Sequence, residues 1–476
     1  MPNISPTHFD LVVLGTGLQA ALLAGRAALE GKTVLHLDRH DHYGGSWTTL
    51  SWDQMQQLSE CPPASQLSNI ASGIGINADM GKLSAYAFDL ALRVMYCSGQ
   101  AIETLVACGA HHYLEFKLVS GNSFWNGRQL QGVPAGRADV FQDRSLSLSS
   151  KRMLMRFLRS TQEALEGRGS LLDAFDGRPF MQLLEQQGLD RQLRHVLLHA
   201  VALSPWNQDN SPSAQGILTA AEGQAALAKH AASMGRFGPG SSAFLTPVYG
   251  GCELSQAFCR VAAVHGALYV LRQPIAALLM DTGCDSAIGA ESADLPCCRG
   301  VQLNTGQEVT CDALAAEPSY LQEFSRREGV GPSAKHEAVS RGICILDKPL
   351  QEGDGQLLMT IPPGSLHENC QHAIHALQLG PACAVTPPDR WMLQLSCPAS
   401  NLDSAAADLL PALEMLVNEG FAACQLTHTP EDRLAETSAQ ILLEGLEPSC
   451  RSPNSHCHCV IKRPDEDPCS QIDELL

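Results

Sequence analysis

The sequence predicts an α/β protein in which a smaller, all-helical domain is inserted into a larger domain. Three observations lead to this class. A strand, a glycine-rich turn, a helix and a second strand follow one another at the N-terminus; helical patterns fill the middle of the chain; and strand-like segments return after them. Strands that alternate with helices are typical of a parallel sheet covered by helices.

The N-terminal unit has the pattern of a Rossmann-type βαβ fold. Residues 11–14 are a continuous apolar run, as expected of a strand buried on both faces. Residues 21–29 are rich in Ala and Leu and predict a helix, which Gly31 ends. Residues 34–37 predict the second strand. This order is that of the folds that bind FAD or NAD(P).

The turn of this unit carries the residues of a dinucleotide-binding motif. Gly15 allows a tight turn, Gly17 allows a phosphate to approach the backbone, and Ala20 allows close packing of helix and strand. Asp38 follows the second strand, roughly 20 residues later, where an acid would hold a ribose hydroxyl. The motif predicts the fold, but a fold does not dictate its function.

Composition limits the possible partners. The 476-residue chain has a net charge of −18, which argues against a nucleic-acid groove and against adsorption to anionic lipid. No apolar run reaches the ~20 residues needed to span a bilayer, and the N-terminus lacks the pattern of a signal peptide. The 18 cysteines are scattered through apolar segments, which favours free thiols in a reducing compartment. We therefore expect a cytoplasmic protein.

Further elements are predicted before the helical block. Helical patterns cover residues 83–96 and 101–110. Residues 113–119 alternate between apolar and polar side chains and predict a strand. Residues 124–128 contain Asn-Gly and predict a β-hairpin. Ser149 or Ser150 is expected to cap a following helix.

The remaining elements define the expected domain organisation. A helix is predicted over 403–419, and strands are predicted over 267–271, 301–303, 343–346, 357–361 and 391–395. The expected parts are the first part of the large domain at 1–140, the helical insert at 141–228, the second part of the large domain at 229–447, and a disordered tail at 448–476.

No catalytic constellation accompanies this fold. The sequence contains no HExxH, GxSxG or P-loop motif and no CxxC pair, so no catalytic or metal-ligating residue is assigned. The chain thus has a dinucleotide-binding type of fold without visible redox residues. A flavin oxidoreductase stays open as one alternative.

Ordered blocks of sequence resemble the GDP-dissociation inhibitor and Rab escort protein family. They run from about residue 9 to 395, and after the glycine turn they comprise residues 43–45, 113–117, 137–141, 151–158, 235–238 and 247–260. The blocks at 45–47 and 137–141 resemble the Rab escort branch, which is component A of Rab geranylgeranyltransferase. The C-terminal part matches less well, and a long insertion of many escort proteins is missing, so the inhibitor branch is an alternative.

The resemblance implies the nature of the large domain. It would be similar to a flavin-monooxygenase fold that no longer holds flavin. No cofactor is then expected, and Gly15, Gly17, Ala20 and Asp38 form a vestigial motif. The protein would be a non-catalytic accessory component and not an enzyme.

The resemblance also implies a surface that binds GDP-bound Rab GTPases. Tyr43, Glu253 and Arg260 match its positions, and Leu268 and Val270 fall where the family has further contacts. Glu253 and Arg260 are seven residues apart, so two turns of one helix would bring them to the same side.

The helical insert is where the family contacts the transferase and holds the lipid. Phe141 and Arg152 match the escort-type anchors for the Rab geranylgeranyltransferase α/β heterodimer. Apolar positions that could line a pocket for the geranylgeranyl lipid, or equally belong to the core, are Met153, Leu154, Phe157, Val196, Leu197 and Leu198.

The leading functional hypothesis is therefore a Rab escort protein. It would bind GDP-bound Rab, present it for C-terminal prenylation, and deliver the product to membranes during transient association. The alternatives are a GDP-dissociation inhibitor that recycles prenylated Rab and, more distantly, an FAD-dependent oxidoreductase.

Overall fold

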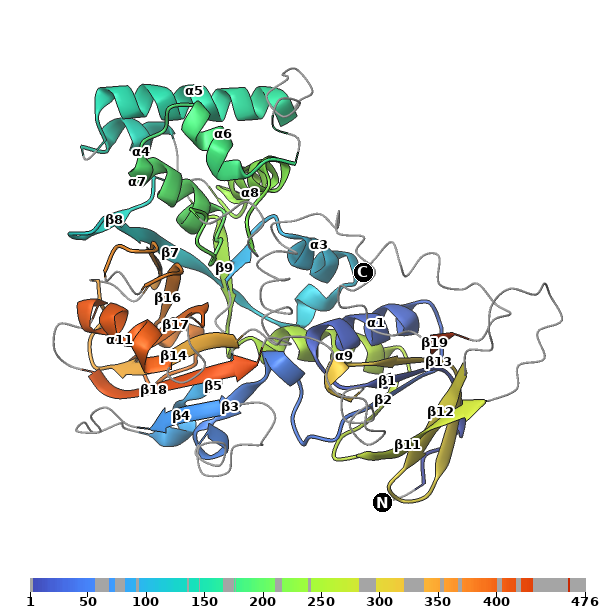
Figure 1. Ribbon diagram of the computed structural model, residues 1–476. Coiled ribbons are helices and arrows are strands. Elements are labelled where there is room, and N and C mark those ends of the chain that lie inside the picture. The colour runs from blue at the N-terminus through green and yellow to red at the C-terminus, as the bar shows by residue number, and fades with distance from the viewer. Residues whose placement is uncertain are drawn as a thin grey trace.

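Two large β-sheets and a helical block make up the molecule (Figure 1). The predicted α/β class with a dinucleotide-binding type of fold is confirmed. The computed structural model describes residues 3–55, 68–72, 82–90, 94–134, 137–144, 146–165, 175, 177–209, 216–238, 241–281, 297–320, 338–351, 355–366, 370–399, 405–416, 421–430 and 461–462.

The first sheet carries the glycine turn. β1 pairs in parallel with both β2 and β13, and β10 pairs in parallel with β2. Its strands, in spatial order, are β10 (Leu268–Val270), β2 (Val34–Leu37), β1 (His8–Leu14), β13 (Glu308–Ala316), β12 (Cys297–Leu303) and β11 (Ile275–Asp281).

The first sheet is buried on both faces at its centre, as the apolar run of β1 predicted. Leu11 and Val13 pack against helix α1 (Leu18–Leu29), whereas Val12 and Leu14 pack on the other face against β12 and β13. Helix α9 (Cys252–Val264) packs in turn on α1. Ala262 of α9 also enters the apolar cluster of Leu11 and Val13, so α1 and α9 both contribute to covering this face of the sheet.

The second sheet is mostly antiparallel and is covered on one face by helix α11 (Ala405–Leu416). A small pair, β3 (Thr49–Ser51) and β5 (Ala87–Asp89), lies beside it (Figure 1). The strands of the second sheet, in spatial order, are β4 (Ser68–Ser72), β18 (Phe421–Pro430), β14 (Ala338–Leu346), β17 (Trp391–Pro398), β16 (Ile374–Leu379), β15 (Gln356–Ile361), β7 (Phe116–Trp125), β9 (Phe244–Pro247) and β6 (Met95–Tyr96).

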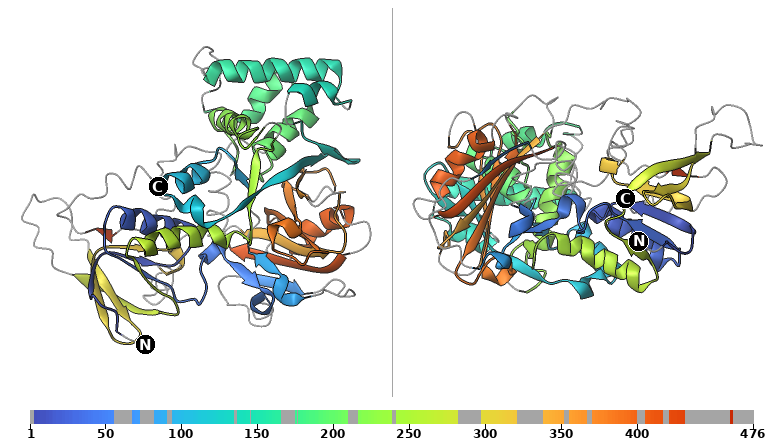
Figure 2. Two further views of the ribbon diagram at one scale, coloured as in Figure 1. Left: turned by 180° about the vertical axis from the view of Figure 1, so that it is seen from behind. Right: turned by 90° about the horizontal axis from the view of Figure 1, so that it is seen from below.

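The helical block stands away from the first sheet, at the end of the β7–β8 hairpin (Figures 1 and 2). Strand β8 covers Leu130–Gly132. The helices are α4 (Arg137–Gln142), α5 (Leu148–Leu165), α6 (Phe180–Gln186), α7 (Arg191–His195), a π-helical segment (Val196–Val201) and α8 (Ala220–Ser233).

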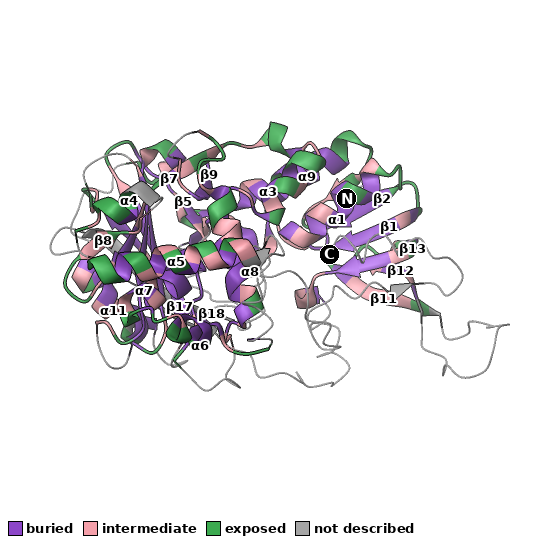
Figure 3. Ribbon diagram, turned by 90° about the horizontal axis from the view of Figure 1, so that it is seen from above, coloured by how far each residue is buried: buried purple, intermediate pink, exposed green. Residues whose placement is uncertain are grey.

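The helices of this block share their own apolar core, which includes Phe157, Phe180 and Leu198. Helix α5 alternates buried and exposed residues along its length (Figure 3), as an amphipathic helix on a core does. The helices begin four residues before the predicted insert and end five residues after it.

The structure contradicts the helix expected over residues 83–96. Strand β5 and strand β6 lie there instead, and helix α3 (Gln100–Ala107) forms close to the second helical pattern. Tyr86 and Phe88 stack with ring centroids 5.8 Å apart and enter the core. The partner strands β3 and β9 are distant in sequence, so tertiary pairing outweighs the local pattern.

Two residues of the expected disordered tail are ordered. Strand β19 (Ile461–Lys462) pairs with Ala313 and Leu314 of β13. Strand β12 pairs with β13 only up to Thr310, so the next positions are open to another strand. The other residues of the 448–476 segment lie outside the described residues.

Candidate functional site

A carboxylate fills the space beside the glycine turn. Gly15 has φ +97° and Gly17 precedes α1. The backbone N–H of Gly17 donates to the carboxylate of Glu317, which follows β13 directly. A Cβ added at Gly15 would lie 2.2 Å from the carboxyl carbon of Glu317. Sequence reasoning missed Glu317, because nothing in the motif refers to the end of a strand about 300 residues away.

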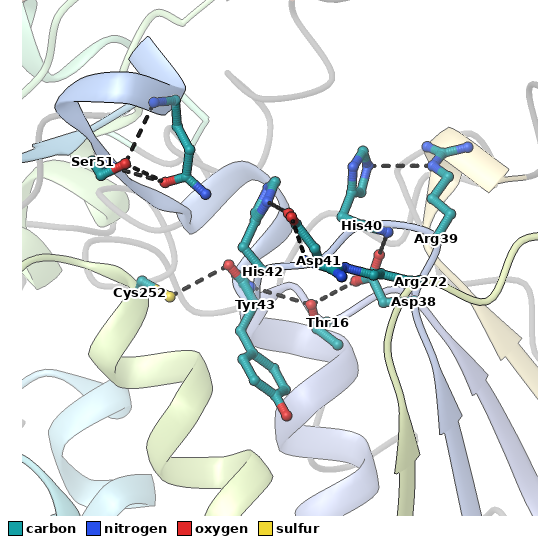
Figure 4. A network of polar contacts seen from close by, with 12 residues as sticks. Thr16, Asp38, Arg39, His40, Asp41, His42, Tyr43, Ser51, Cys252 and Arg272 are labelled. Atoms are coloured by element: carbon teal, nitrogen blue, oxygen red, sulfur yellow. Dashed lines mark hydrogen bonds and ion pairs between the residues drawn. The ribbon is translucent and has the colours of Figure 1, made fainter. Parts of the chain in front are cut away.

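Asp38 is buried at 2% exposure and is bonded within the protein (Figure 4). It accepts hydrogen bonds from the Thr16 hydroxyl at 2.6 Å, from the His40 backbone N–H at 2.9 Å and from the Tyr320 hydroxyl at 3.3 Å. Burial, and then the charge of Asp38, raise the pKa of Tyr320, so its hydroxyl keeps the proton that it donates. Both oxygens of Asp38 are therefore engaged where a ribose was expected.

These residues do not fit a bound dinucleotide. In this fold a pyrophosphate binds at the glycine turn and the start of the following helix. The Glu317 carboxylate already occupies this place. A pyrophosphate would overlap with it sterically and would be repelled by its negative charge. Ala20 keeps its expected packing role: it is buried between α1 and β1.

Helix α9 presents a polar side outward. Its inner side approaches α1 closely, since a Cβ at Gly25 would lie 3.3 Å from the Phe258 carbonyl oxygen. Arg260 is exposed and Glu253 is half-buried. Burial raises the pKa of Glu253, whose Oε1 accepts from Gln256 Nε2 at 3.2 Å. Two helical turns separate Glu253 from Arg260, about 10 Å along the axis.

Tyr43 lies beside α9 and β10. The Cys252 thiol contacts the Tyr43 carbonyl oxygen at 3.4 Å, and the Tyr43 ring lies 6.2 Å from that of Tyr269 on β10. Burial raises the pKa of Tyr43. On the same strand, Leu268 is 37% exposed and Val270 is partly buried against the core. We call Tyr43, Glu253, Arg260, Leu268 and Val270 the platform surface.

Three exposed residues lie near the end of α4 and in the first turns of α5. Phe141 is 65% exposed, and its carbonyl oxygen accepts from Lys151 Nζ at 2.7 Å. Arg152, the next residue along α5, is exposed. Leu148 is 73% exposed and lies four residues before Arg152, on the same side of the helix. We call Phe141, Leu148 and Arg152 the Phe141 surface.

Sequence reasoning missed Leu148 because it placed the start of α5 at Ser149 or Ser150. The structure contradicts that cap: Ser147 is the capping residue, and its Oγ accepts from the Ser150 N–H at 3.0 Å. Leu148 therefore occupies the first turn of the helix.

The helical block and the β7–β8 hairpin line an apolar cavity of about 270 Å³. Leu154, Val196 and Leu197, three of the six candidate lining residues, do line it. Phe157, Leu198 and Met153 pack in the helical core instead. The wall also includes Phe124, Val133, Val140, Leu146, Met155, Leu158, Leu193, Val201, Leu227 and Met234.

Polar groups occupy restricted parts of the cavity wall. Beside β8, Gln131 Nε2 donates to Asp143 Oδ2 at 3.0 Å, and Gln192 Nε2 donates to Gln131 Oε1 at 3.2 Å. On α8, burial lowers the pKa of His230 to about 4, so its imidazole is neutral at physiological pH. The rest of the wall is suited to hydrocarbon.

Among the residues that the structure describes, no group of three or more His, Cys, Asp and Glu side chains is placed to hold a metal ion. In the same part of the chain, no helix combines the length and the apolar character that crossing a membrane requires.

The fold and these sites define a class of protein: a flavoprotein-like α/β architecture whose glycine turn is filled by a side chain, with a helical block that holds an apolar cavity. Residues 6–443 match the GDP dissociation inhibitor family. The chain belongs to that family.

Relatives of both branches are similar to this chain. It is 30% identical over 468 residues to Rab escort protein 1 of Arabidopsis thaliana, covering 88% of this chain and 81% of that protein. It is 28% identical over 350 residues to guanosine nucleotide diphosphate dissociation inhibitor 2 of the same plant, covering 72% and 69%. The resemblance drawn from the sequence blocks is confirmed.

Solved structures support the fold. The structure of Rab GDI from Plasmodium falciparum superposes with a TM-score of 0.68 at 21% identity, covering 89% of each chain. An oxidoreductase from Methanosarcina mazei superposes with a TM-score of 0.56 at 14% identity, covering 87% of each chain. At these identities the likeness concerns the fold alone.

Proposed function

We propose that this chain is a non-catalytic Rab escort protein. It binds GDP-bound Rab, presents it to the α/β heterodimer of Rab geranylgeranyltransferase for C-terminal prenylation, and delivers prenylated Rab to membranes from the cytoplasm. The observation that carries the proposal is the Phe141 surface: two large apolar side chains and a cation are exposed at the end of α4 and the start of α5, two helices that also line the cavity.

The Phe141 surface has the composition of a protein contact. Phe141 and Leu148 are more than half exposed, and exposed apolar patches are typical of interaction sites. Arg152 adds a residue type enriched at interfaces. The Lys151 bond to the Phe141 carbonyl fixes α4 against α5, so the surface is preformed.

The platform surface would receive the GTPase. A half-buried Glu253 and an exposed Arg260 present opposite charges on one side of α9. Tyr43 adds an aromatic group that is anchored against α9 and β10. Aromatic and Arg side chains are the usual anchors of interfaces.

The cavity would hold the geranylgeranyl lipid. Its volume of about 270 Å³ is just below the range of ligand pockets, which span roughly 300–1,000 Å³. Each methylene moved from water into such a site contributes about 0.8 kcal/mol. A lipid chain therefore supplies affinity that the platform surface alone does not.

A GDP-dissociation inhibitor is the second candidate. The platform surface and the cavity serve that role equally well, and the Rab GDI of Plasmodium falciparum has the same fold. For either role we propose that the protein acts without flavin, since Glu317 occupies the glycine turn. An FAD-dependent oxidoreductase is the least supported function.

In vitro prenylation tests the proposal. Rab, geranylgeranyl diphosphate and the transferase heterodimer are combined with and without this chain, and lipid transfer to Rab is measured. We expect transfer only when the chain is present. Extraction of prenylated Rab from membranes, without any support of prenylation, would make the chain an inhibitor-type recycler.

A further inference from the structure

The glycine turn retains the geometry of an anion site and holds an anion of its own. We propose that the carboxylate of Glu317 is the permanent anionic ligand of this turn, taking the place of a phosphate, and that it thereby orders the loop over residues 38–47. The site would accept an inorganic anion, such as pyrophosphate, once that carboxylate is removed.

Three glycines surround the carboxylate. The Gly17 N–H donates to Oε1 of Glu317. A Cβ at Gly15 would lie 2.5 Å from that oxygen, and a Cβ at Gly45 would lie 3.2 Å from Oε2. Backbone without side chains therefore encloses the carboxylate from three sides, as it encloses a phosphate in this fold.

The helix behind the turn favours a negative group at this position. Helix α1 has 12 residues, and its first turn contains no acidic residue. The free N–H groups and the dipole at a helix N-terminus stabilise an anion. Glu317 supplies that anion from the neighbouring strand, whose last residues pair with β1.

The segment that carries Glu317 also fastens the loop after β2. Tyr320 accepts from the Arg39 N–H at 2.8 Å and donates to Asp38. At the other end of the loop, the Gly44 N–H donates to the Thr16 carbonyl oxygen at 3.1 Å. The carboxylate lies against the turn and against Gly45, the residue after the second attachment. Its loss would leave a hole in the middle of a bonded network.

This arrangement predicts a chemical rescue that ordinary packing does not. Glu317→Ala removes the anion and leaves the Gly17 N–H donor in place. We expect the thermal unfolding midpoint to fall by at least about 3 °C and amide hydrogen exchange within residues 38–47 to accelerate. Millimolar pyrophosphate should restore at least half of both losses, since a ligand that binds only the folded state stabilises it.

Three controls isolate the anion site. Glu308→Ala removes an exposed carboxylate at the start of the same strand and should change neither readout. Glu317→Gln keeps the volume but loses the charge, so it should lose stability that pyrophosphate does not restore, because its amide still fills the site. It tests the role of the charge even where Glu317→Ala fails to fold. Wild type should gain nothing from pyrophosphate beyond the effect of chloride at equal ionic strength.

Rescue of Glu317→Ala without an equal effect on wild type, together with a loss of stability in Glu317→Gln, supports the proposal. A loss of stability in Glu317→Ala that pyrophosphate does not reverse would overturn it, because a merely structural contact explains that result. Variants as stable as wild type would overturn it too, as would pyrophosphate or FAD binding to wild type. None of these readouts depends on a Rab.

Discussion

Replacing Phe141 by Ala should weaken binding to the prenyltransferase and leave the fold intact. A Phe side chain presents about 200 Å², and 65% of Phe141 is exposed, which leaves about 130 Å² for a partner to cover. At about 25 cal/mol per Å² this corresponds to roughly 3 kcal/mol when fully covered. Incomplete covering leaves about 2 kcal/mol, or roughly a thirtyfold loss of affinity.

The assay is a pulldown of the transferase heterodimer by Rab-loaded protein, followed by prenylation. Because little of Phe141 is buried, its truncation should change the free energy of unfolding by less than about 1 kcal/mol. Phe237→Ala is the matched control: Phe237 is 54% exposed but follows α8 at the far end of the helical block. Full recruitment by Phe141→Ala would refute this use of the surface, and no recruitment by wild type would refute the escort function itself.

Three further predictions concern other parts of the molecule. Glu253→Ala and Arg260→Ala should each weaken GDP-Rab binding by at least about thirtyfold, measured by titration calorimetry; unchanged affinity in both would remove α9 from the interface. Leu158→Trp should fill part of the cavity and reduce extraction of prenylated Rab more than tenfold, the equivalent of about two methylenes. The control is Arg159→Trp, which changes the exposed neighbouring residue of α5 and should leave extraction of prenylated Rab normal. Burial lowers the pKa of His230 to about 4, below the unfolded value of 6.5, so the unfolded state binds a proton more readily. The free energy of unfolding is therefore at its full value above about pH 6.5 and decreases as pH falls toward 4. Between about pH 8 and pH 5, urea unfolding should show wild type losing about 2 kcal/mol more than His230→Leu; equal losses would contradict the shift.

Local patterns predicted those elements that their own residues determine. The apolar run of β1, the Ala-rich α1 and the Asn-Gly hairpin between β7 and β8 all formed as expected. The failure over residues 83–96 has a non-local cause, since β5 and β6 pair with strands supplied from other parts of the chain.

The candidate sites show the same division. Helical spacing was sufficient to place Glu253 and Arg260 on one side of α9. No spacing rule connects Gly17 to Glu317, because the contact exists only after β13 pairs with β1. The exposed Leu148 was missed for a smaller reason, a shift of the helix cap to Ser147. Residues that act through tertiary pairing are thus the ones that sequence reasoning overlooks.

The length of strand β7 determines how far a ligand must reach to occupy both the platform surface and the cavity. At its first end, the Glu115 carbonyl accepts from the Val248 N–H, which lies a few residues before α9 of the platform surface. Near its other end, Phe124 lines the cavity. Nine residues of extended strand separate these points, about 30 Å. A GTPase seated on the platform surface with its lipid in the cavity needs a tether of roughly nine fully extended residues. Shortening a Rab tail below that length should uncouple lipid capture from docking.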